Sequence, residues 1–370
     1  MTLAVAAAIA LIWANVEGGR AYRATWNRVA PWSSLVGVHL TLRDSVNQGL
    51  LFVFFALVGL EIRREFTAGE LRTLRRAAVP ILAALAGMAV PALIYTAAVA
   101  GGSGAKGWGI PMATDIGFAL GALALIGTTS GRARVFLMTL AVADDIASIM
   151  VLVAFYGHHT RLSWLLPAVG ALVTLGAVWA RSLPGWWIRA VLAAFAWWAL
   201  LRAGVDAAVV GAALGVFGPG RRATKGTARI ATVRRWVVRL EPAVNGVVLP
   251  LFALANIGTT FGLSLWHDAA AMRVLAAVTL ARLLGKPIGI TAGTVLARRI
   301  VGVDDPRISP RELVGVATLG SIGFTVPLLI IAQALPAGNL TDAAILGLLI
   351  SSVVGAGGGW VVLRLLRPRH

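Results

Sequence analysis

The chain has 370 residues, of which 58% are hydrophobic and only 13% are charged, and its mean hydropathy is +0.84. It carries a formal charge of +18 and contains no cysteine, which excludes disulfide bonds and thiolate metal sites. Apolar runs of about 20 residues, each long enough for one bilayer crossing, recur along the whole length and leave no room for a soluble domain.

These runs predict an all-α polytopic membrane protein that forms one integral membrane domain over residues 1–370. The first run stops after about 14 apolar residues, which is short for a span, so we expect the N-terminus to be truncated or misassigned. We expect about twelve transmembrane helices. They are predicted to begin near Thr2, Val46, Ala77, Gly107, Val135, Leu162, Trp187, Val205, Val244, Val274, Leu313 and Asp342.

The loop between the first two spans has a strand-like pattern from Val36 to Leu42. Apolar residues alternate there with Gly37, His39 and Thr41, and period-two alternation is typical of a strand. We therefore expect a small extracytoplasmic β-hairpin whose exposed edge pairs with a second copy of the protein to form a homodimer. A loop lying on the membrane surface is the alternative.

Two spans contain helix-breaking residues around polar ones: "GWGIPMATDIGFALGALALIG", which includes Thr114 and Asp115, and "GVATLGSIGFTVPLLIIAQAL". Both contain the tripeptide IGF and precede a span with adjacent polar residues. An odd displacement of seven spans makes the two units inverted repeats, over about residues 77–156 and 274–364. Interrupted helices at membrane depth need cover from protein or a water-filled cavity, which indicates an ion or substrate site near the midplane.

The run "VFLMTLAVADDIASIMVLVAFY" places Asp144 and Asp145 among 22 otherwise uncharged residues. A carboxylate at the bilayer centre costs several kcal/mol unless it faces water, a cation or a basic partner. Neighbours on a helix point about 100° apart, and they repel each other by about 2 to 3 kcal/mol at an effective dielectric of about 20. At least one of the two is therefore expected to exchange a proton near neutral pH.

Lys286 is a candidate partner, because it is one of only three lysines and lies inside the span "VLAAVTLARLLGKPIGITAGTVLA". It is either a group that can lose its proton or the permanent structural partner of one aspartate. Arg282, one turn earlier, is a second possible partner. The other aspartate, with Thr114, Asp115 and freed carbonyl groups, would supply the oxygen ligands that Na⁺ or Li⁺ requires. Competition between metal ion and proton then couples the two fluxes.

Basic residues predict the orientation. With a cytoplasmic N-terminus, most of the 33 Lys and Arg fall in cytoplasmic loops, seven of them in "GRRATKGTARIATVRRWVVRLE", and both termini are cytoplasmic. The basic residues are scattered among short loops rather than gathered on a folded face, which argues against nucleic-acid binding.

The motifs "PMATDIGFALGALALIG", "VFLMTLAVADDIASIM", "LVGLEIRREF", "LPLFALANIG", "GKPIGI" and "GSIGFTVPLLIIAQAL" together resemble the NhaA-type sodium/proton antiporters, from about Asn47 to the end of the chain. The resemblance implies a bacterial inner-membrane transporter that exchanges cytoplasmic Na⁺ or Li⁺ for external H⁺, electrogenically and under pH control. No cofactor is implied beyond the transported ions.

The resemblance also implies roles for single residues. Asp145 would be the principal ion ligand, and Asp144 would titrate and pair with Lys286. Thr114 and Asp115 would compensate the helix ends where two interrupted helices cross. Three further acids would line a cytoplasmic funnel that senses pH, although solvated acids among loop arginines are the alternative; these are Glu61, Glu65 and Glu241.

Two positions depart from the family pattern. The family often has His in a "GVHAT" stretch where this chain reads "GVDAA", with Asp206 in place of the imidazole that titrates near neutrality. Gln48 replaces the acid of an "ND" pair. We therefore expect the pH response to differ.

Three other function classes fit less well. A sodium-coupled solute symporter would need hydrogen-bonding or aromatic groups near the ion site, where this chain has mostly Ala, Val and Ile. An intramembrane aspartyl protease needs aspartates that face each other from different helices. A transition-metal site is not expected because all histidines fall in loops or the tail, at His39, His158, His159, His267 and His370.

Overall fold

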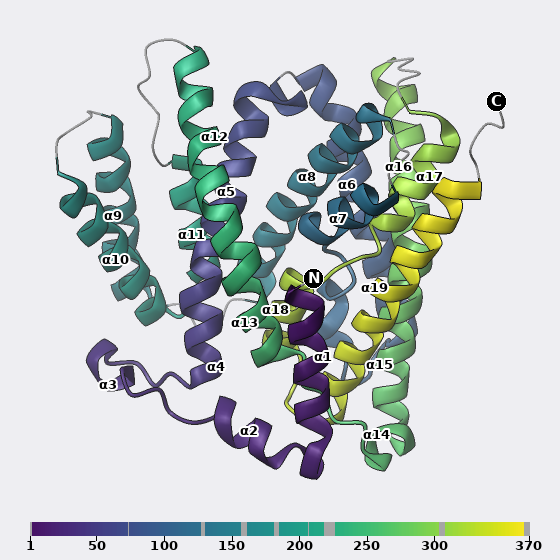
Figure 1. Cartoon of the computed structure of the whole chain (residues 1–370), viewed down its shortest axis with the longest axis horizontal. Helices are drawn as coiled ribbons and strands as arrows, with labels where there is room; N and C mark the ends of the chain where they lie inside the picture. The colour runs from purple at the N-terminus through teal and green to yellow at the C-terminus, as the bar shows by residue number, and fades with distance from the viewer. Residues whose placement is uncertain are drawn as a thin grey trace. The chain divides into compact units, whose positions relative to one another are not determined.

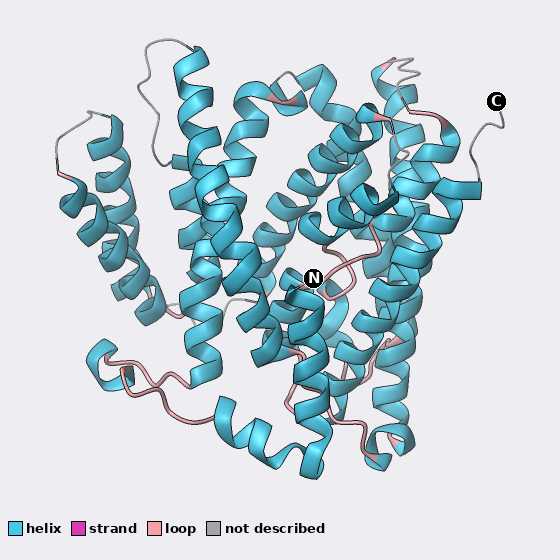
Figure 2. Ribbon diagram, in the orientation of Figure 1, coloured by secondary structure: helices cyan, strands magenta, loops and turns pink. Residues whose placement is uncertain are grey.

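A computed structural model describes residues 2–72, 74–126, 130–156, 161–180, 185–205, 207–217, 226–302 and 308–365. Within these ranges every regular element is a helix and there is no strand (Figure 2). The predicted all-α membrane fold is confirmed. Helices suit these apolar runs because each satisfies its own backbone hydrogen bonds in a medium without water.

The chain divides into two compact units. Unit 1 comprises Met1–Ala68 and Leu152–Thr260. Its α-helices are labelled in Figure 1, where α9 and α10 lie side by side. They are α1 (Thr2–Asn15), η1 (Val16–Gly19), α2 (Arg20–Trp26), α3 (Ser33–Val36), α4 (Leu42–Ser45), η2 (Val46–Leu50), α5 (Leu51–Ala68), α9 (Leu162–Ala180), α10 (Trp186–Ala203), α11 (Ala207–Phe217), α12 (Gly226–Ala243), η5 (Val244–Val248) and α13 (Leu249–Asn256).

Unit 2 comprises Gly69–Val151 and Phe261–His370, so α8 runs from it into unit 1. Its helices are η3 (Glu70–Arg72), α6 (Leu74–Ala98), η4 (Ala105–Gly109), α7 (Ile116–Ile126), α8 (Gly131–Phe155), α14 (Leu263–His267), α15 (Ala269–Leu280), η6 (Ala281–Gly285), α16 (Lys286–Val301), α17 (Pro310–Leu319), α18 (Thr325–Ala334) and α19 (Asn339–Leu365). The inverted-repeat boundaries, and the single domain over the whole chain, stay predictions.

Eight helices in the described residues are long and apolar enough to cross a bilayer. Three shorter apolar helices accompany them, at Ile116–Ile126, Ala208–Phe217 and Thr325–Ala334. Two of these three follow the predicted interruptions, which explains why they are too short to cross alone. The chain is thus a multi-pass membrane protein, and the count of twelve spans stays a prediction.

Small residues allow the closest helix contacts in each unit. In unit 1, a Cβ atom on Gly211 would collide with the carbonyl oxygen of Phe52, and one on Gly215 with that of Ala56, so α11 lies directly against the backbone of α5. Close backbone approach replaces the hydrophobic effect as the main source of helix association in lipid.

In unit 2, glycines allow the same close packing between α6 and α16. Gly285, Gly289 and Gly293 repeat every four residues and so share one face of the helix. A Cβ atom on Gly289 would collide with the carbonyl oxygen of Ala86, and one on Gly285 would lie 2.8 Å from Cα of Pro91. This packing fixes the start of α16, where Lys286 is located.

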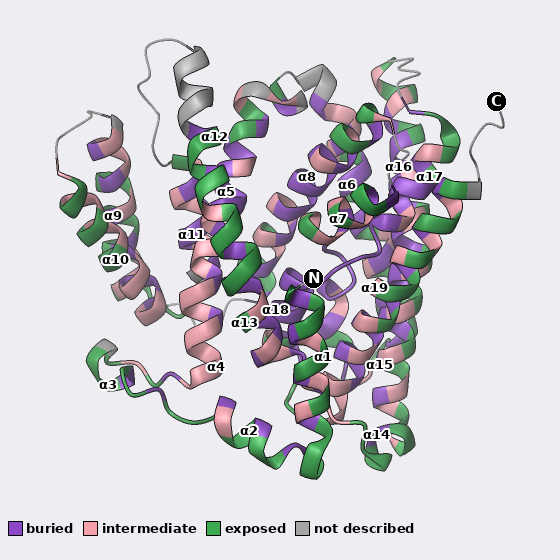
Figure 3. Cartoon of the chain, in the orientation of Figure 1, coloured by how far each residue is buried: buried purple, intermediate pink, exposed green. Residues whose placement is uncertain are grey.

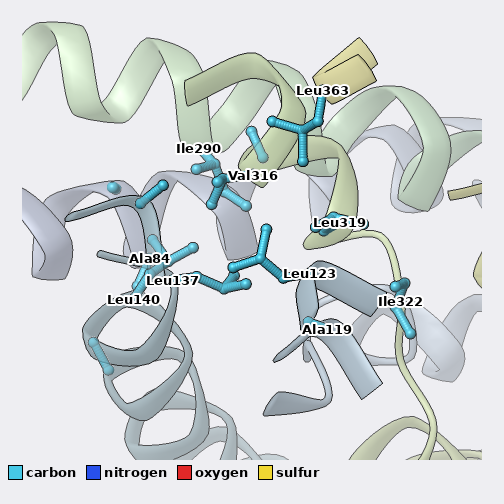
Figure 4. Close-up of a cluster of buried hydrophobic side chains, with 14 of the residues drawn as sticks. Ala84, Ala119, Leu123, Leu137, Leu140, Ile290, Val316, Leu319, Ile322 and Leu363 are labelled. Carbon is cyan, nitrogen blue, oxygen red and sulfur yellow. The ribbon is translucent and has the colours of Figure 1, made fainter. Parts of the chain in front are cut away.

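A buried hydrophobic cluster joins the helices around the two interruptions (Figure 4). It takes residues from α6, α7, α8, α16, α17 and α19, and from the loop between α17 and α18. The labelled members are Ala84, Ala119, Leu123, Leu137, Leu140, Ile290, Val316, Leu319, Ile322 and Leu363. The loop residue Ile322 is part of this core, so the interruption is held by packing as well as by hydrogen bonds.

Both predicted interruptions are present and lie in unit 2. One is the segment 110–115 between η4 and α7, and the other is 320–324 between α17 and α18. All residues of both segments are buried, and Figure 3 shows the second loop in the colour of buried residues. Irregular backbone at membrane depth is thus covered by protein, as the physics of a lipid environment requires.

The loop predicted to form a β-hairpin contains an isolated antiparallel bridge between Val29 and Thr41 and a short helix, α3. The bridge is flanked by backbone hydrogen bonds from Ala30 N to Leu40 O (2.8 Å) and from Leu42 N to Arg28 O (2.9 Å). A hairpin and a dimer through this loop stay predictions.

Candidate ion-binding site

The five residues predicted to form the ion site lie in unit 2, and the side chains of all five are buried. Asp144 and Asp145 lie in the middle of α8, Thr114 and Asp115 in the first interruption, and Lys286 at the start of α16. Each exposes 5% or less of its surface. Three segments that are distant in sequence thus contribute polar groups to the interior of one unit.

Asp144 is held by two donors from different elements. Lys286 Nζ lies 3.0 Å from Oδ2 and 3.1 Å from Oδ1 of its carboxylate, and the backbone N–H of Thr114 donates to Oδ2 at 2.6 Å. The predicted pairing of Lys286 with an aspartate is present, with Asp144 as the partner. The Thr114 hydroxyl donates to the carbonyl oxygen of Gly320 at 2.9 Å, which ties the first interruption to the second.

Asp115 connects the two interruptions at the N-terminal ends of two helices. Its carboxylate accepts from the hydroxyl of Thr325 (2.9 Å) at the start of α18 and from the backbone N–H of Phe118 (3.3 Å) in the first turn of α7. Its own backbone N–H donates to the carbonyl of Ile322 at 3.0 Å. A carboxylate in this position compensates the partial positive charge of both helix ends.

Arg282 provides the opposite compensation. It lies in the π-helical turn η6 and is fully buried, and its Nε and Nη2 atoms donate to the carbonyl of Ser321 at 3.1 and 2.9 Å. Nη1 lies 3.4 Å from the carbonyl of Ile110, and the Ser321 hydroxyl donates to the carbonyl of Arg282 at 2.9 Å. A fixed cation therefore faces the carbonyl groups that the interruptions expose. Gly323 must be a glycine because a Cβ there would collide with the guanidinium.

The span after each interruption bonds back to that interruption. In the first unit of the predicted repeat, Asp144 accepts from Thr114 N. In the second, the Ser352 hydroxyl of α19 accepts from the backbone N–H of Gly323 at 3.2 Å and donates to its carbonyl at 2.9 Å. The group that bonds back is thus a carboxylate on α8 and a neutral hydroxyl on α19.

The three acids expected to sense pH lie in unit 1. Glu65 is buried and Glu61 half-buried on α5, whereas Glu241 is exposed on α12. Their part in a funnel stays a prediction. Asp206 lies outside the described residues. Within the described ranges, there is no group of three or more His, Cys, Asp or Glu that could hold a metal ion.

Sequence reasoning missed two contributors. It considered Arg282 as a partner for an aspartate, whereas its guanidinium donates to backbone carbonyls. Ser352, one of two adjacent serines in the span after the second interruption, was not predicted to bond to Gly323. An arginine inside a membrane span is a signal for the first, because a buried guanidinium needs several acceptors.

Comparisons with known proteins agree with this architecture. The family model described as Na⁺/H⁺ antiporter 1 matches residues 1–363. The chain is 40% identical over 380 residues to the Na⁺/H⁺ antiporter NhaA of Frankia casuarinae, covering 98% of this chain and 84% of the relative. It is 38% identical over 378 residues to Na⁺/H⁺ antiporter NhaA 2 of Novosphingobium aromaticivorans, covering 98% and 93%.

A solved structure of the sodium proton antiporter MjNhaP1 from Methanocaldococcus jannaschii is also similar. It aligns over 99% of both chains with a TM-score of 0.50 and 15% sequence identity. At this identity the likeness concerns the fold alone.

Proposed function

Because this chain belongs to the Na⁺/H⁺ antiporter 1 family, whose members are transporters, we propose that it carries both of its ions on the pair Asp144 and Asp145. Cytoplasmic Na⁺ or Li⁺ and external H⁺ compete for these carboxylates, which face the two sides of the membrane in alternation. The observation that supports this most directly is the burial of both carboxylates beside a buried lysine and two interrupted helices.

The two aspartates have different roles in this proposal. Asp144 is already bonded to Lys286 and to Thr114 N, so its oxygens are less free to surround a cation. Asp145, the residue that the resemblance to the family selects, is the principal metal ligand, and the Asp144–Lys286 pair releases a proton when the metal ion enters and takes one up when it leaves. Thr114 and Asp115 keep the interruptions in place around the site.

Net charge moves in each cycle. Two carboxylates and one ammonium group can gain or lose protons at a site that binds a single metal ion. More than one proton can therefore be exchanged for each Na⁺. We further propose that Glu61, Glu65 and Glu241 adjust activity to pH at the cytoplasmic entrance. We also propose a bacterial inner-membrane location with both termini cytoplasmic, and a homodimer formed through the loop near Val36–Leu42.

Asp145→Asn tests the proposed site. The amide keeps the shape of the side chain but removes the charge that would balance a metal ion, so exchange should fall to the level of empty vesicles. The assay is Na⁺ efflux from reconstituted vesicles, driven by an imposed proton gradient with no organic solute present. That condition also separates an antiporter from a sodium-coupled symporter.

Asp268→Asn is the matched control. The Asp268 side chain caps the N-terminus of α15 by accepting from Ala270 N and Ala271 N, and asparagine is an equally good cap. This variant loses one carboxylate of unit 2 outside the site and should retain normal exchange. Substantial exchange by folded Asp145→Asn protein would refute the proposed role of that aspartate.

A further inference from the structure

Ser148 lies on the part of α8 that faces between the two aspartates. It follows Asp144 by four residues and Asp145 by three. At 3.6 residues per turn, its side chain points about 40° from that of Asp144 and about 60° from that of Asp145. Residues three and four apart on a helix have Cβ atoms about 5 to 6 Å apart. A metal ion held between the two carboxylates would thus be within reach of the Ser148 hydroxyl.

The hydroxyl of Ser148 has no hydrogen-bond partner among the described residues, although the side chain is only 1% exposed. A buried hydroxyl without a partner is costly, because it gives up its bonds to water and gains nothing. In a helix, serine normally avoids this cost by donating to the carbonyl four residues earlier. Ser148 does not make that bond.

The other buried Ser and Thr hydroxyls described in unit 2 all have partners. Thr139, Thr294 and Ser351 donate to carbonyls of their own helices, at 3.0, 2.6 and 2.9 Å. Thr114 and Thr325 bond from one interruption to the other, and Ser321 donates to the carbonyl of Arg282 in η6. Ser148 is therefore the exception in a unit that otherwise satisfies its buried hydroxyls, and it is the one next to both aspartates.

We propose that Ser148 Oγ is a ligand of the transported metal ion and sets the affinity and selectivity of the site. This inference rests on the proposed ion site at Asp144 and Asp145. A hydroxyl oxygen is a hard, neutral ligand of the kind that Na⁺ accepts. It adds coordination without adding a charge, so it strengthens metal binding and leaves proton binding to the carboxylates.

Because the hydroxyl would bind only the metal ion and the carboxylates also bind protons, Ser148→Ala has a specific expected effect. The KM for Na⁺ should rise about tenfold, with little change in maximal rate. The KM for Li⁺ should rise less, because the smaller ion takes fewer ligands. The inhibition constant of protons against Na⁺ should not change, because the carboxylates remain. Ser148→Thr keeps the hydroxyl and should restore most of the Na⁺ affinity.

The control is Thr294→Val, which removes an equally buried hydroxyl whose bond goes to the carbonyl of Ile290 on α16. It should leave both KM values unchanged. Thermal unfolding of each variant is measured alongside transport, because a purely structural role for Ser148 would change stability and leave the ratio of the two KM values as it is.

Asp145→Asn in the same assay distinguishes a failure of the proposed aspartate site from a failure of the proposed Ser148 ligand. If it is inactive while Ser148→Ala has normal KM values for Na⁺ and Li⁺, Ser148 is not a ligand and the aspartate site stands. If Asp145→Asn transports normally, the aspartate site itself is wrong and the inference on Ser148 fails with it.

Discussion

The ion pair between Lys286 and Asp144 allows a quantitative prediction. Both groups are buried, with 1% and 2% of their side chains exposed, and the charged atoms are 3.0 Å apart. At an effective dielectric of about 20, the attraction at this distance is about 5 kcal/mol. Removing one partner of a buried pair costs about 3 to 5 kcal/mol because the other charge remains without compensation.

The loss of stability caused by Lys286→Gln should be at the lower end of that range. The Thr114 N–H still donates to Asp144 at 2.6 Å, so the carboxylate keeps one strong donor. We expect a loss of about 3 kcal/mol in the free energy of unfolding. Equilibrium unfolding of the purified protein in mixed detergent micelles measures it. Lys106→Gln removes an exposed lysine and should stay within about 0.5 kcal/mol of the parent.

A double-mutant cycle gives the refuting test. Asp144→Asn in the Lys286→Gln background removes both charges, so the double variant should recover at least 2 kcal/mol relative to the sum of the single losses, about the coupling found for groups in direct contact. Single effects that add to within about 0.5 kcal/mol would show that the two groups do not interact, and would remove the basis for giving Asp144 and Asp145 different roles.

Three more changes test other parts of unit 2. Arg282→Leu leaves the Ser321 carbonyl without its donors, so the free energy of unfolding should fall by at least about 2 kcal/mol. Gly289→Ala forces α16 away from α6 and should cost about 1 to 3 kcal/mol, measured by the same unfolding assay. The carboxylate of Glu312, at the start of α17, accepts a hydrogen bond from Ser130 N. Partial burial opposes its ionisation, but the hydrogen bonds that it accepts from Ser130 and Ser309 outweigh this effect. They lower the pKa of Glu312 below its usual value of 4.5. Since a lowered pKa stabilises the folded chain above the ordinary value, the stability difference from Glu312→Gln should be largest at neutral pH and should shrink as the pH falls below about 4.5.

The first two changes have a control variant, and the third has a refuting outcome. Arg282→Lys keeps the charge but cannot reproduce the paired N–H donors, and should be intermediate between the parent and Arg282→Leu. Gly357→Ala meets open space and should stabilise α19 by about 0.5 to 1 kcal/mol, because alanine is the better helix former. Equal effects at Gly289 and Gly357 would contradict the packing argument. A pH-independent difference for Glu312→Gln would contradict the hydrogen-bonding argument.

The sequence predicted the parts of the site that follow from the cost of charge in lipid. A carboxylate inside a span had to face water, a cation or a basic partner, and Lys286 was one of very few cations inside a span. The choice of Asp144 as the partner came from the resemblance to the family. Glycine and proline likewise indicated both interruptions, because they break a helix wherever they occur in clusters. These inferences depend only on residue type and position along the chain.

Other features depend on backbone geometry that residue types do not reveal. Arg282 lies in the π-helical turn η6, and its guanidinium donates to the carbonyl of Ser321 rather than to an aspartate oxygen. In the loop near Val36–Leu42, the Ser33 hydroxyl donates to Val38 O at 2.7 Å and accepts from Leu40 N at 3.1 Å. These local bonds use backbone groups that a longer strand ladder would need, and alternation of residue types does not reveal them.

The bonds of Asp115 and Arg282 across the two interruptions have a consequence for the transport cycle. Neither residue has to give up its partners for Na⁺ or H⁺ to come and go, because both are satisfied by backbone or hydroxyl groups that never leave the protein. The bonds that hold the two interruptions together therefore do not have to break when Na⁺ or H⁺ binds. During the conformational change of the transport cycle, the two interrupted segments can then move as one rigid body, with their hydrogen bonds intact.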